Sequence, residues 1–196
     1  AKKKHKKESY NFMGWLTSVV DNGGERIKYE YYSNGKIKSA QIGENCNSRI
    51  LLAYDGRGNK TLVHDPNYGQ MSYKYDALGN IRRISNAQYV VDMEYDVLGR
   101  MMQRTENNLQ HKTMRVVRWE YSCDKGYDGL LSRVSSSGGH HIEYGYDDKF
   151  RLAHTMESIN GKSFKTTYSY DAANRVETIT YPSGFCVLKR YSNAGY

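Results

Sequence analysis

The stretch Tyr95-Asp96-Val97-Leu98-Gly99-Arg100-Met101 decides the fold, because copies of it recur along the chain. A second clear copy is Tyr75-Asp76-Ala77-Leu78-Gly79-Asn80-Ile81. Both share one frame: Tyr, Asp, two variable positions, Gly, a polar or basic residue, and an aliphatic residue. Repetition at a fixed period of this length is typical of repeat architectures.

The frame recurs about nine times in the 196 residues. The copies start near positions 10, 31, 54, 75, 95, 121, 146, 170 and 191, in steps of 20 to 26 residues. The copy at Tyr121 is degenerate and the one at Tyr191 is truncated. This regularity indicates that one structural unit is repeated.

Each part of the frame predicts a piece of a β-hairpin. The Asp side chain can accept backbone N–H groups in an Asx turn, and the Gly can take the positive φ that a short hairpin loop needs. Asn174, which tolerates that conformation, replaces Gly in one copy, whereas Phe150 breaks the rule in another. The predicted turn residues are Asp55, Gly58, Asp76, Gly79, Asp96, Gly99, Asp147, Asp171 and Asn174.

Aromatic residues alternate with other residues just before each Asp, as in Tyr73-Lys74-Tyr75. A period of two places them on one face of a strand. Two interpretations stay open: cross-strand packing, or a flat aromatic surface that binds glycan or another protein. The residues of this predicted face are Tyr73, Tyr75, Tyr95, Trp119, Tyr121, Tyr144, Tyr146, Tyr168 and Tyr170.

A second set of turn signals lies about midway through the repeats, for example Asn22-Gly23-Gly24 and Pro182-Ser183-Gly184. Each repeat is therefore expected to hold two strands and two turns. We predict an all-β fold with little or no helix: a long antiparallel meander of β-hairpin repeats, about 16 to 18 strands, forming a curved strip or partial spiral shell. Residues 1–8 are expected to be a basic disordered tail or a boundary remnant, and residues 9–196 a repeat β domain.

The formal net charge of +8 is concentrated at one end. Five of the 29 Lys and Arg residues lie in the first seven positions, which leaves 24 basic against 21 acidic groups in the rest. A short basic run could bind a membrane surface or nucleic acid, but it is more typical of a solvated terminus. No nucleic-acid partner is expected for the nearly balanced body.

Residues capable of chemistry are scattered. Cys46, Cys123 and Cys186 form no disulfide framework or zinc-ligand spacing, and a nucleophilic Cys123 is disfavoured against an incidental thiol. The adjacent His140 and His141 would point to opposite faces of a strand. The repeated Asp residues have a sufficient role in turns without Ca²⁺. We therefore expect no enzyme activity, no metal site and no cofactor.

Export signals and membrane spans are not evident. No apolar stretch approaches the roughly 18 residues of a membrane-spanning helix, and no apolar signal-peptide core is present. If the protein is secreted or displayed on a cell surface, we expect its signal to lie outside this chain.

The motif Tyr-Asp-x-x-Gly-Arg, present as Tyr95 to Arg100, resembles the YD repeat of the Rhs family. That family includes bacterial Rhs polymorphic toxins, wall-associated proteins, the shell component of insecticidal Tc toxins, and animal teneurins. The similarity covers residues 9–196. It implies a β-strip that spirals into a hollow shell around an unfolded or toxic C-terminal polypeptide.

Two departures from the family pattern bear on that expectation. First, known shells contain more repeats. Second, the stretch Asp65-Pro66-Asn67-Tyr68-Gly69 does not match the autoproteolytic end of an Rhs shell, and a turn suffices to explain it. No toxin is expected after the repeats in this chain, so a fragment or a short strip is favoured.

The resemblance and the residues together predict a non-catalytic scaffold, part of a bacterial, secreted or surface-displayed Rhs-like shell that encapsulates or displays a toxin. The alternative is a repeat module that binds glycan or a cell-surface protein through its Tyr-rich face. The expected partner is the remainder of a larger polypeptide. Unpaired edge strands also predict edge-to-edge self-association.

Overall fold

The computed structural model describes residues 6–124 and 126–192, and nearly all of their regular structure is β-strand. A one-turn 3-10 helix, η1 (Cys46–Ser48), is the exception within these ranges. The strands are β1 (Lys7–Tyr10), β2 (Leu16–Val20), β3 (Arg26–Tyr31), β4 (Ile37–Ile42), β5 (Arg49–Tyr54), β6 (Lys60–Asp65), β7 (Gly69–Tyr75), β8 (Ile81–Ser85), β9 (Tyr89–Tyr95), β10 (Met101–Asn108), β11 (Thr113–Tyr121), β12 (Leu131–Ser136), β13 (His141–Tyr146), β14 (Leu152–Ile159), β15 (Lys162–Tyr170), β16 (Val176–Thr180) and β17 (Cys186–Leu188). The all-β class is confirmed, and 17 strands fall within the predicted number.

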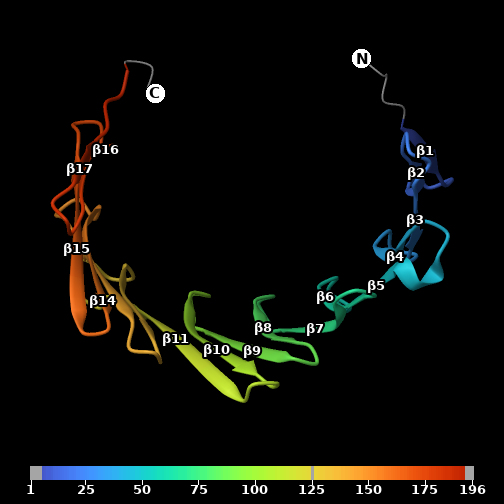
Figure 1. Ribbon diagram of the computed structural model, residues 1–196, viewed down its shortest axis with the longest axis horizontal. Coiled ribbons are helices and arrows are strands. Elements are labelled where there is room, and N and C mark those ends of the chain that lie inside the picture. Colours follow the sequence, from blue (N-terminus) through green and yellow to red (C-terminus); the bar gives the residue numbers. More distant parts are fainter. Residues whose placement is uncertain (1–5, 125, 193–196) are drawn as a thin grey trace. The chain divides into compact units, whose positions relative to one another are not determined.

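The chain separates into two compact units. Unit 1 runs up to Asp92 and includes Asn107–Thr113, and unit 2 comprises Met93–Glu106 and the chain from Met114 onward. Figure 1 shows each unit as a single layer of strands, without a helix or second sheet packed against it in the described ranges. The predicted single repeat domain thus contains two clusters of internal contacts.

Unit 1 is a meander in which each strand pairs antiparallel with the next, from β1 to the first part of β9. The register places Leu52 opposite Val63 and Tyr73 opposite Ile84, so apolar side chains share one face. Lys74 lies opposite Arg83 on the other face. This is the alternation that a period of two produces.

Unit 2 follows the same pattern from β11 to β17. Trp119 lies opposite Val134, and Val134 lies opposite Ile142, so an apolar row continues across three strands. In both units the register shifts where a strand reaches the Tyr of the repeat, for example between Ser169 and Tyr170. Such a bulge bends a strand and increases its twist.

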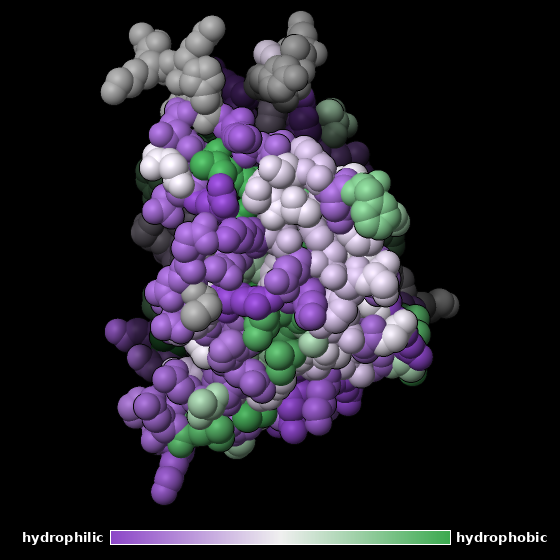
Figure 2. All heavy atoms as spheres, turned by 90° about the vertical axis from the view of Figure 1, so that its right-hand side faces the viewer, coloured by the Kyte–Doolittle hydropathy of each residue, from purple (hydrophilic) through white to green (hydrophobic). Residues whose placement is uncertain are grey.

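A single layer leaves little room for a buried core. Met93 and Val116 are the buried apolar residues of the described ranges, at 7% and 8% exposure, and Ser39 is the buried polar residue. Most other strand residues are half-buried. On the face drawn in Figure 2, polar residues predominate and hydrophobic ones form separate patches. Hydrogen bonds and contacts between neighbouring hairpins must therefore provide much of the stability.

The N-terminal boundary differs from the expectation in one respect. Strand β1 begins at Lys7, and Lys7 and Glu8 pair with Val20 and Val19 of β2, so these two residues are not part of a disordered tail. The pairing supplies backbone partners that the charge pattern of the sequence does not reveal. Residues 1–5 lie outside the described residues.

The intermediate turns lie where the sequence placed them. Gly24, Gly139 and Gly184 all have positive φ, and the N–H of each donates to the carbonyl of the residue three positions earlier. These three intermediate turns thus share the geometry of the repeat turn, whereas Asn160 and Gly161, with φ of 50° and 75°, form a two-residue turn between Ile159 and Lys162. No helix in the described ranges is long and apolar enough to cross a membrane.

Candidate functional site

The repeated turn is built around one carboxylate, as the Asp96 copy shows. Its Oδ1 accepts the backbone N–H groups of Leu98 and Arg100, both at 2.9 Å. The Asp96 N–H donates to the Arg100 carbonyl at 2.9 Å, and the Gly99 N–H donates to the Asp96 carbonyl at 3.0 Å. These four bonds close a three-residue loop, and Gly99 provides the required φ of 77°.

The residue after the Gly position donates a hydrogen bond to the other carboxylate oxygen. In the copies at Asp96, Asp147 and Asp171 an Arg four residues later donates from Nε to Oδ2, at 2.7 to 2.8 Å. In the copies at Asp55 and Asp76 an Asn donates from Nδ2 at 3.0 Å instead. Each Asp therefore has both oxygens engaged in its own turn, which leaves little capacity for a metal ion.

These hydrogen bonds control the charge of the turn carboxylates. A side-chain hydrogen bond from Asn80, with backbone N–H groups, lowers the pKa of Asp76. At Asp96 desolvation raises the pKa, but the backbone and side chain of Arg100 lower it further, so the net shift is downward. The pKa values of Asp55, Asp147 and Asp171 are also lowered. The turns are therefore built around ionised carboxylates.

Phe150 keeps the turn conformation although its sequence breaks the rule. It has φ 61°, close to the 62° of Asn174, and its N–H donates to the Asp147 carbonyl at 3.0 Å. Its ring packs edge-on against Tyr127, with the ring centroids 5.4 Å apart. An aromatic contact therefore offsets part of the cost of a left-handed residue with a side chain.

In six copies the Tyr of the repeat joins its hairpin to the hairpin before it. The hydroxyl of Tyr170 donates to the carbonyl of Leu152 at 2.9 Å, and that of Tyr146 donates to Leu131 at 2.9 Å. Leu152 and Leu131 each begin the returning strand of the preceding repeat. The same bond is made by Tyr31 to Leu16, Tyr75 to Lys60, Tyr121 to Met101, and Tyr191 to Val176.

Partial burial is the main cause of a raised pKa for several of these phenols. It raises the pKa of Tyr31, Tyr75, Tyr146 and Tyr170, and neighbouring tyrosines add to the effect. Each phenol is therefore kept protonated, which is the form that can donate to a carbonyl.

Cations stack on the same rings. The Arg100 guanidinium carbon lies 4.1 Å from the Tyr121 ring centroid, Arg151 lies 4.4 Å from that of Tyr170, and Arg175 lies 4.3 Å from that of Tyr191. The guanidinium therefore closes its own turn through the Asp and covers the Tyr of the next repeat. Contacts of this kind contribute about 0.5–1 kcal/mol at exposed sites.

The predicted aromatic face is thus used largely for packing and hydrogen bonding between hairpins. All nine of its residues are half-buried. The hydroxyls of Tyr75, Tyr121, Tyr146 and Tyr170 donate to backbone carbonyls, while those of Tyr73 and Tyr95 contact the sulfur atoms of Met71 and Met93. The structure brings the pairs Tyr73 with Tyr75 and Tyr144 with Tyr146 into the walls of two hollows.

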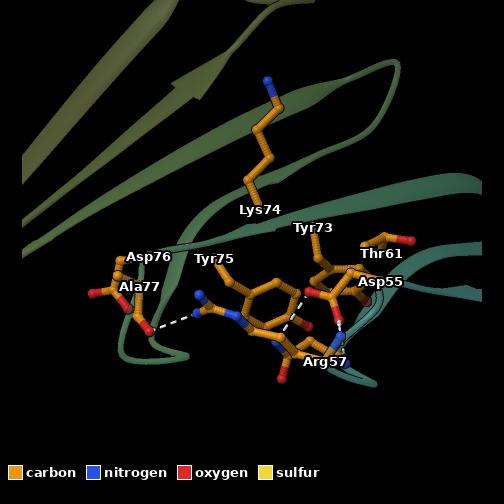
Figure 3. Close-up of a pocket in the computed structure, with 9 residues that line it drawn as sticks. Asp55, Arg57, Thr61, Tyr73, Lys74, Tyr75, Asp76 and Ala77 are labelled. Carbon is orange, nitrogen blue, oxygen red and sulfur yellow. Dashed lines mark hydrogen bonds between the residues drawn. The ribbon is translucent and has the colours of Figure 1, made fainter.

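The larger of these hollows, about 510 Å³, lies between two repeats of unit 1. Tyr73 and Tyr75 form one side, and Asp55, Asn59 and Asp76 contribute polar groups. Figure 3 shows the Lys74 side chain pointing away from the other labelled residues. An aromatic floor with carboxylates and an amide around it is suited to a planar polar group.

Two features of the site escaped the sequence analysis. The first is the cation stack, whose signal was a long side chain five positions after the Tyr in several copies. The second is Gly145, which lies inside β13 opposite His154, where an added Cβ would overlap the His154 ring. A glycine within a strand can mark such a close approach, but its partner is set by register alone.

The histidines and cysteines do not converge. No group of three or more metal-ligating side chains occurs in the searched ranges 6–124 and 126–192. His140 Nε2 and Glu157 Oε1 are 2.7 Å apart in a surface pair. Cys123 and Cys186 are exposed free thiols, and Cys123 contacts the Tyr121 carbonyl. The geometry contains no nucleophile paired with a base among these residues.

Comparison with known proteins agrees with the repeat geometry. The RHS Repeat family matches residues 155–185, which span the end of one hairpin and most of the next. The structure is similar to the crystal structures of TcdB2-TccC3 and TcdB2-TccC3-TEV, with TM-scores of 0.80 and 0.79. Sequence identity is 16% in both cases, and the similarity covers 96% of this chain and 11% of those chains.

Curated relatives are similar over most of this chain. Mouse Teneurin-4 is 26% identical over 199 residues, covering 89% of this chain. The Double-stranded DNA deaminase toxin A of Burkholderia cenocepacia (strain H111) is 26% identical over 168 residues, covering 78%. The chain spans only 7% and 10% of the lengths of these two proteins.

The fold, the recurring turn and these similarities define a repetitive β-scaffold. The resemblance to the Rhs/YD-repeat family is thereby confirmed. The chain is built of repeats that resemble the Rhs/YD type, in which Asp shapes the turn and, in six copies, Tyr joins a hairpin to the one before it.

Proposed function

We propose that this scaffold is one stretch of a larger Rhs/YD-repeat shell that encloses a C-terminal polypeptide, such as a toxin or effector, and that it acts without catalysis. The observation that carries the proposal is the junction between repeats. Six of the repeat tyrosines donate from the hydroxyl to the first carbonyl of the preceding returning strand, so most hairpins share the same joint to their neighbour.

A recurring joint allows hairpins to be added with little change in packing. Repeat arrays of this kind are stabilised by contacts between nearest neighbours and can extend to any length. A single layer with half-buried faces also forms a wall more readily than a solid domain. On this proposal the parent protein is bacterial and is secreted or surface-displayed, and the chain's main partner is the rest of its own polypeptide.

Protection from proteolysis tests enclosure. The parent polypeptide is treated with protease, and cleavage of the segment after its repeats is followed. We expect that segment to resist cleavage, and Gly99→Val to expose it, because a β-branched residue at φ 77° breaks the turn. Val97→Ala serves as the control, since Val97 is 95% exposed at the tip of the same turn. Equal cleavage in the native protein and in Gly99→Val would reject enclosure.

The alternative, a glycan- or cell-surface-binding module, has less support. Four of the nine aromatic residues commit their hydroxyls to backbone carbonyls, and two of those rings carry a stacked guanidinium. Glycan-array binding that is lost on Tyr73→Ala or Tyr144→Ala, with folding unchanged, would favour this alternative over the shell.

Edge-to-edge self-association also remains a proposal. The strands at the two ends are short, with four residues in β1 and three in β17, and β1 carries Lys7 and Glu8. Short, charged edges reduce such pairing. Concentration-dependent elution in size-exclusion chromatography would support association, and a constant monomer would exclude it.

A further inference from the structure

One position decides what covers the Tyr of the next repeat. It lies five residues after the repeat Tyr, and in five copies its side chain extends over the next Tyr ring. Trp15 lies 5.3 Å from Tyr31 between ring centroids, and Lys36 Nζ lies 5.0 Å from the Tyr54 centroid. Arg100, Arg151 and Arg175 lie 4.1 to 4.4 Å from the next ring.

The same side chains reach the next turn as well. Lys36 Nζ donates to the Gly58 carbonyl at 2.8 Å, and Arg100 donates to the Gly129 carbonyl at 3.0 Å. A Cβ added at Gly58 would lie 2.6 Å from Lys36 Nζ. The side chain at this position therefore occupies a defined slot between one Tyr ring and the following turn.

At the junction between the repeats of Tyr54 and Tyr75 this slot is not filled. The residue in question is Asn59, whose side chain is short and bonds back to Asp55 at 3.0 Å. No ring or cation stack on Tyr75 occurs among the described residues. A Cβ added at Gly79, in the following turn, would meet open space.

The hollow of about 510 Å³ described above lies at this unfilled slot. Its lining includes Asn59, the Tyr75 ring and the Asp55 and Asp76 carboxylates. Arg57 also lines it, but its Nη1 donates to the Ala77 carbonyl at 2.6 Å (Figure 3). The Arg57 guanidinium is thus engaged by the following turn.

A second junction shows the same relationship. The degenerate repeat at Tyr121 has a longer loop, and Leu130 takes the position of Arg100, because its carbonyl accepts from the Ser122 N–H and it precedes Leu131, the partner of Tyr121. Leu130 is neither aromatic nor charged, and no ring or cation stack on Tyr146 occurs among the described residues. A hollow of about 300 Å³ lies there, lined by Tyr144, Tyr146 and Asp124 among others. In both places a junction without a stacked ring or cation coincides with a hollow against a Tyr pair.

We propose that the hollow at Tyr75 is a binding site for a guanidinium group, which stacks on the Tyr75 ring in the place that Arg100, Arg151 and Arg175 occupy at other junctions. The inference does not depend on enclosure of a polypeptide, since it rests on this junction alone.

The chemistry of the hollow fits this ligand. A planar cation gains from the face of an aromatic ring, and a guanidinium can also donate to carboxylate and carbonyl oxygens. Asp55 and Asp76 supply two negative charges. Of the two cations in the lining, Arg57 is hydrogen-bonded to the Ala77 carbonyl, and Lys74 points away from the other labelled residues (Figure 3). The Tyr75 hydroxyl is already committed to the Lys60 carbonyl, which fixes the ring and leaves its face as the contact surface.

Ethylguanidinium is the direct probe, followed by nuclear magnetic resonance of the tyrosine rings at concentrations far below those that unfold the chain. We expect a saturable shift of the Tyr75 ring with a Kd on the order of millimolar, which the cation–π contact and a charge-assisted hydrogen bond to a carboxylate imply together. Propylurea, which is planar but uncharged, should give a shift at least about tenfold weaker. No saturable shift with ethylguanidinium would overturn the proposal.

Two matched variants test whether the probe binds at this slot. Asn59→Arg should fill the slot from within the chain and abolish the Tyr75 shift. Arg151→Asn should open a new slot and give Tyr170 a saturable shift, since Asn is the residue this chain already uses at Asn59 and Asn80. If Asn59→Arg binds as the native chain does, the site is elsewhere and the proposal is wrong.

Arginine within a polypeptide and small guanidinium compounds share this chemistry. A further titration distinguishes these two kinds of ligand. A neutral peptide with one central Arg is titrated beside ethylguanidinium. Affinity at least tenfold higher for the peptide assigns the site to polypeptide, and equal affinity assigns it to small guanidinium compounds. If each variant keeps cooperative unfolding, misfolding is excluded as the cause of a lost Tyr75 shift. The new Tyr170 shift in Arg151→Asn does not depend on whether Asn59→Arg folds.

Discussion

The Tyr170 hydroxyl donates a hydrogen bond of 2.9 Å to the carbonyl of Leu152, 18 residues earlier in the chain. Leu152 is the first residue of β14, and Tyr170 is the last of β15. The bond therefore joins the Tyr of one repeat to the start of the returning strand in the repeat before it. The sheet has few buried residues, so we expect this joint to contribute strongly to keeping neighbouring hairpins in register.

Removal of that hydroxyl should weaken the sheet measurably. We expect Tyr170→Phe to lower the free energy of unfolding by about 0.5–1.5 kcal/mol, because the ring is kept but the Leu152 carbonyl loses its donor. Chemical denaturation measures the change. Tyr68→Phe is the control, because Tyr68 is 84% exposed. Equal stability of Tyr170→Phe and the native chain would show that water replaces the bond without loss.

Stability should fall in acid because of the turn carboxylates. The pKa values of Asp55, Asp76, Asp96, Asp147 and Asp171 are lowered in the folded chain. A lowered folded pKa gives stability that is present above the unfolded value of about 3.9 and is lost as pH falls through the folded value.

Thermal unfolding followed from neutral pH to about pH 2 should therefore show a steep loss of Tm below about pH 4. Asp171→Asn should reduce that dependence, since the side chain no longer changes charge, and should lower Tm at neutral pH. Asp148→Asn, at the exposed tip of a neighbouring turn, should leave the profile unchanged. An acid profile of Asp171→Asn identical to that of the native chain would contradict this role.

Alkaline pH should act through the junction tyrosines. Burial raises the folded pKa of Tyr31, Tyr75, Tyr146 and Tyr170. A raised folded pKa gives stability that is fully present below the unfolded value of about 10 and is lost as pH rises through the folded value. Phenolate absorbance should show these four rings titrating above about 10, with unfolding in the same range. Their titration at or below that value in the folded chain would contradict the junction geometry.

Phe150 should be a strained position that its neighbour compensates. In a Tyr127→Ala background, Phe150→Gly should raise stability by about 1 kcal/mol, because φ 61° costs a residue with a side chain about 1–2 kcal/mol. In the native background the gain should be smaller, since the aromatic contact is lost. Gly79→Ala, with φ 91° and open space around its Cβ, should lower stability by a similar amount. Equal effects of Phe150→Gly in both backgrounds would remove Tyr127 from the explanation.

Gly145 should be required by His154. Gly145→Ala places a Cβ where the His154 ring lies, so the ring must move or the strands must separate. We expect a clear drop of Tm in Gly145→Ala and recovery of most of it in Gly145→Ala with His154→Ala. No recovery in the double variant would mean that the glycine serves the backbone instead.

The hairpins could be predicted from the sequence because their determinants are local. In Asp96 to Arg100 the carboxylate, the glycine and the Arg lie within five residues, so spacing alone indicates the turn. The joints between hairpins could not, because Arg100 and Tyr121 are 21 residues apart and meet only through strand register. Phe150 shows that the turn can also form where the sequence motif is broken. Tyr127 and the flanking strands maintain the turn there.

Hydrogen–deuterium exchange of the backbone amides in Tyr170→Phe combined with Arg151→Ala tests the central claim, that neighbouring hairpins are held by these joints. The two substitutions remove the bond and the stack of a single junction. The account predicts faster exchange in β14, β15 and β16, with strands β2 to β6 of unit 1 unchanged, because stability in such an array is local. Unchanged exchange in β14 to β16, or an equal increase along the whole chain, would contradict it.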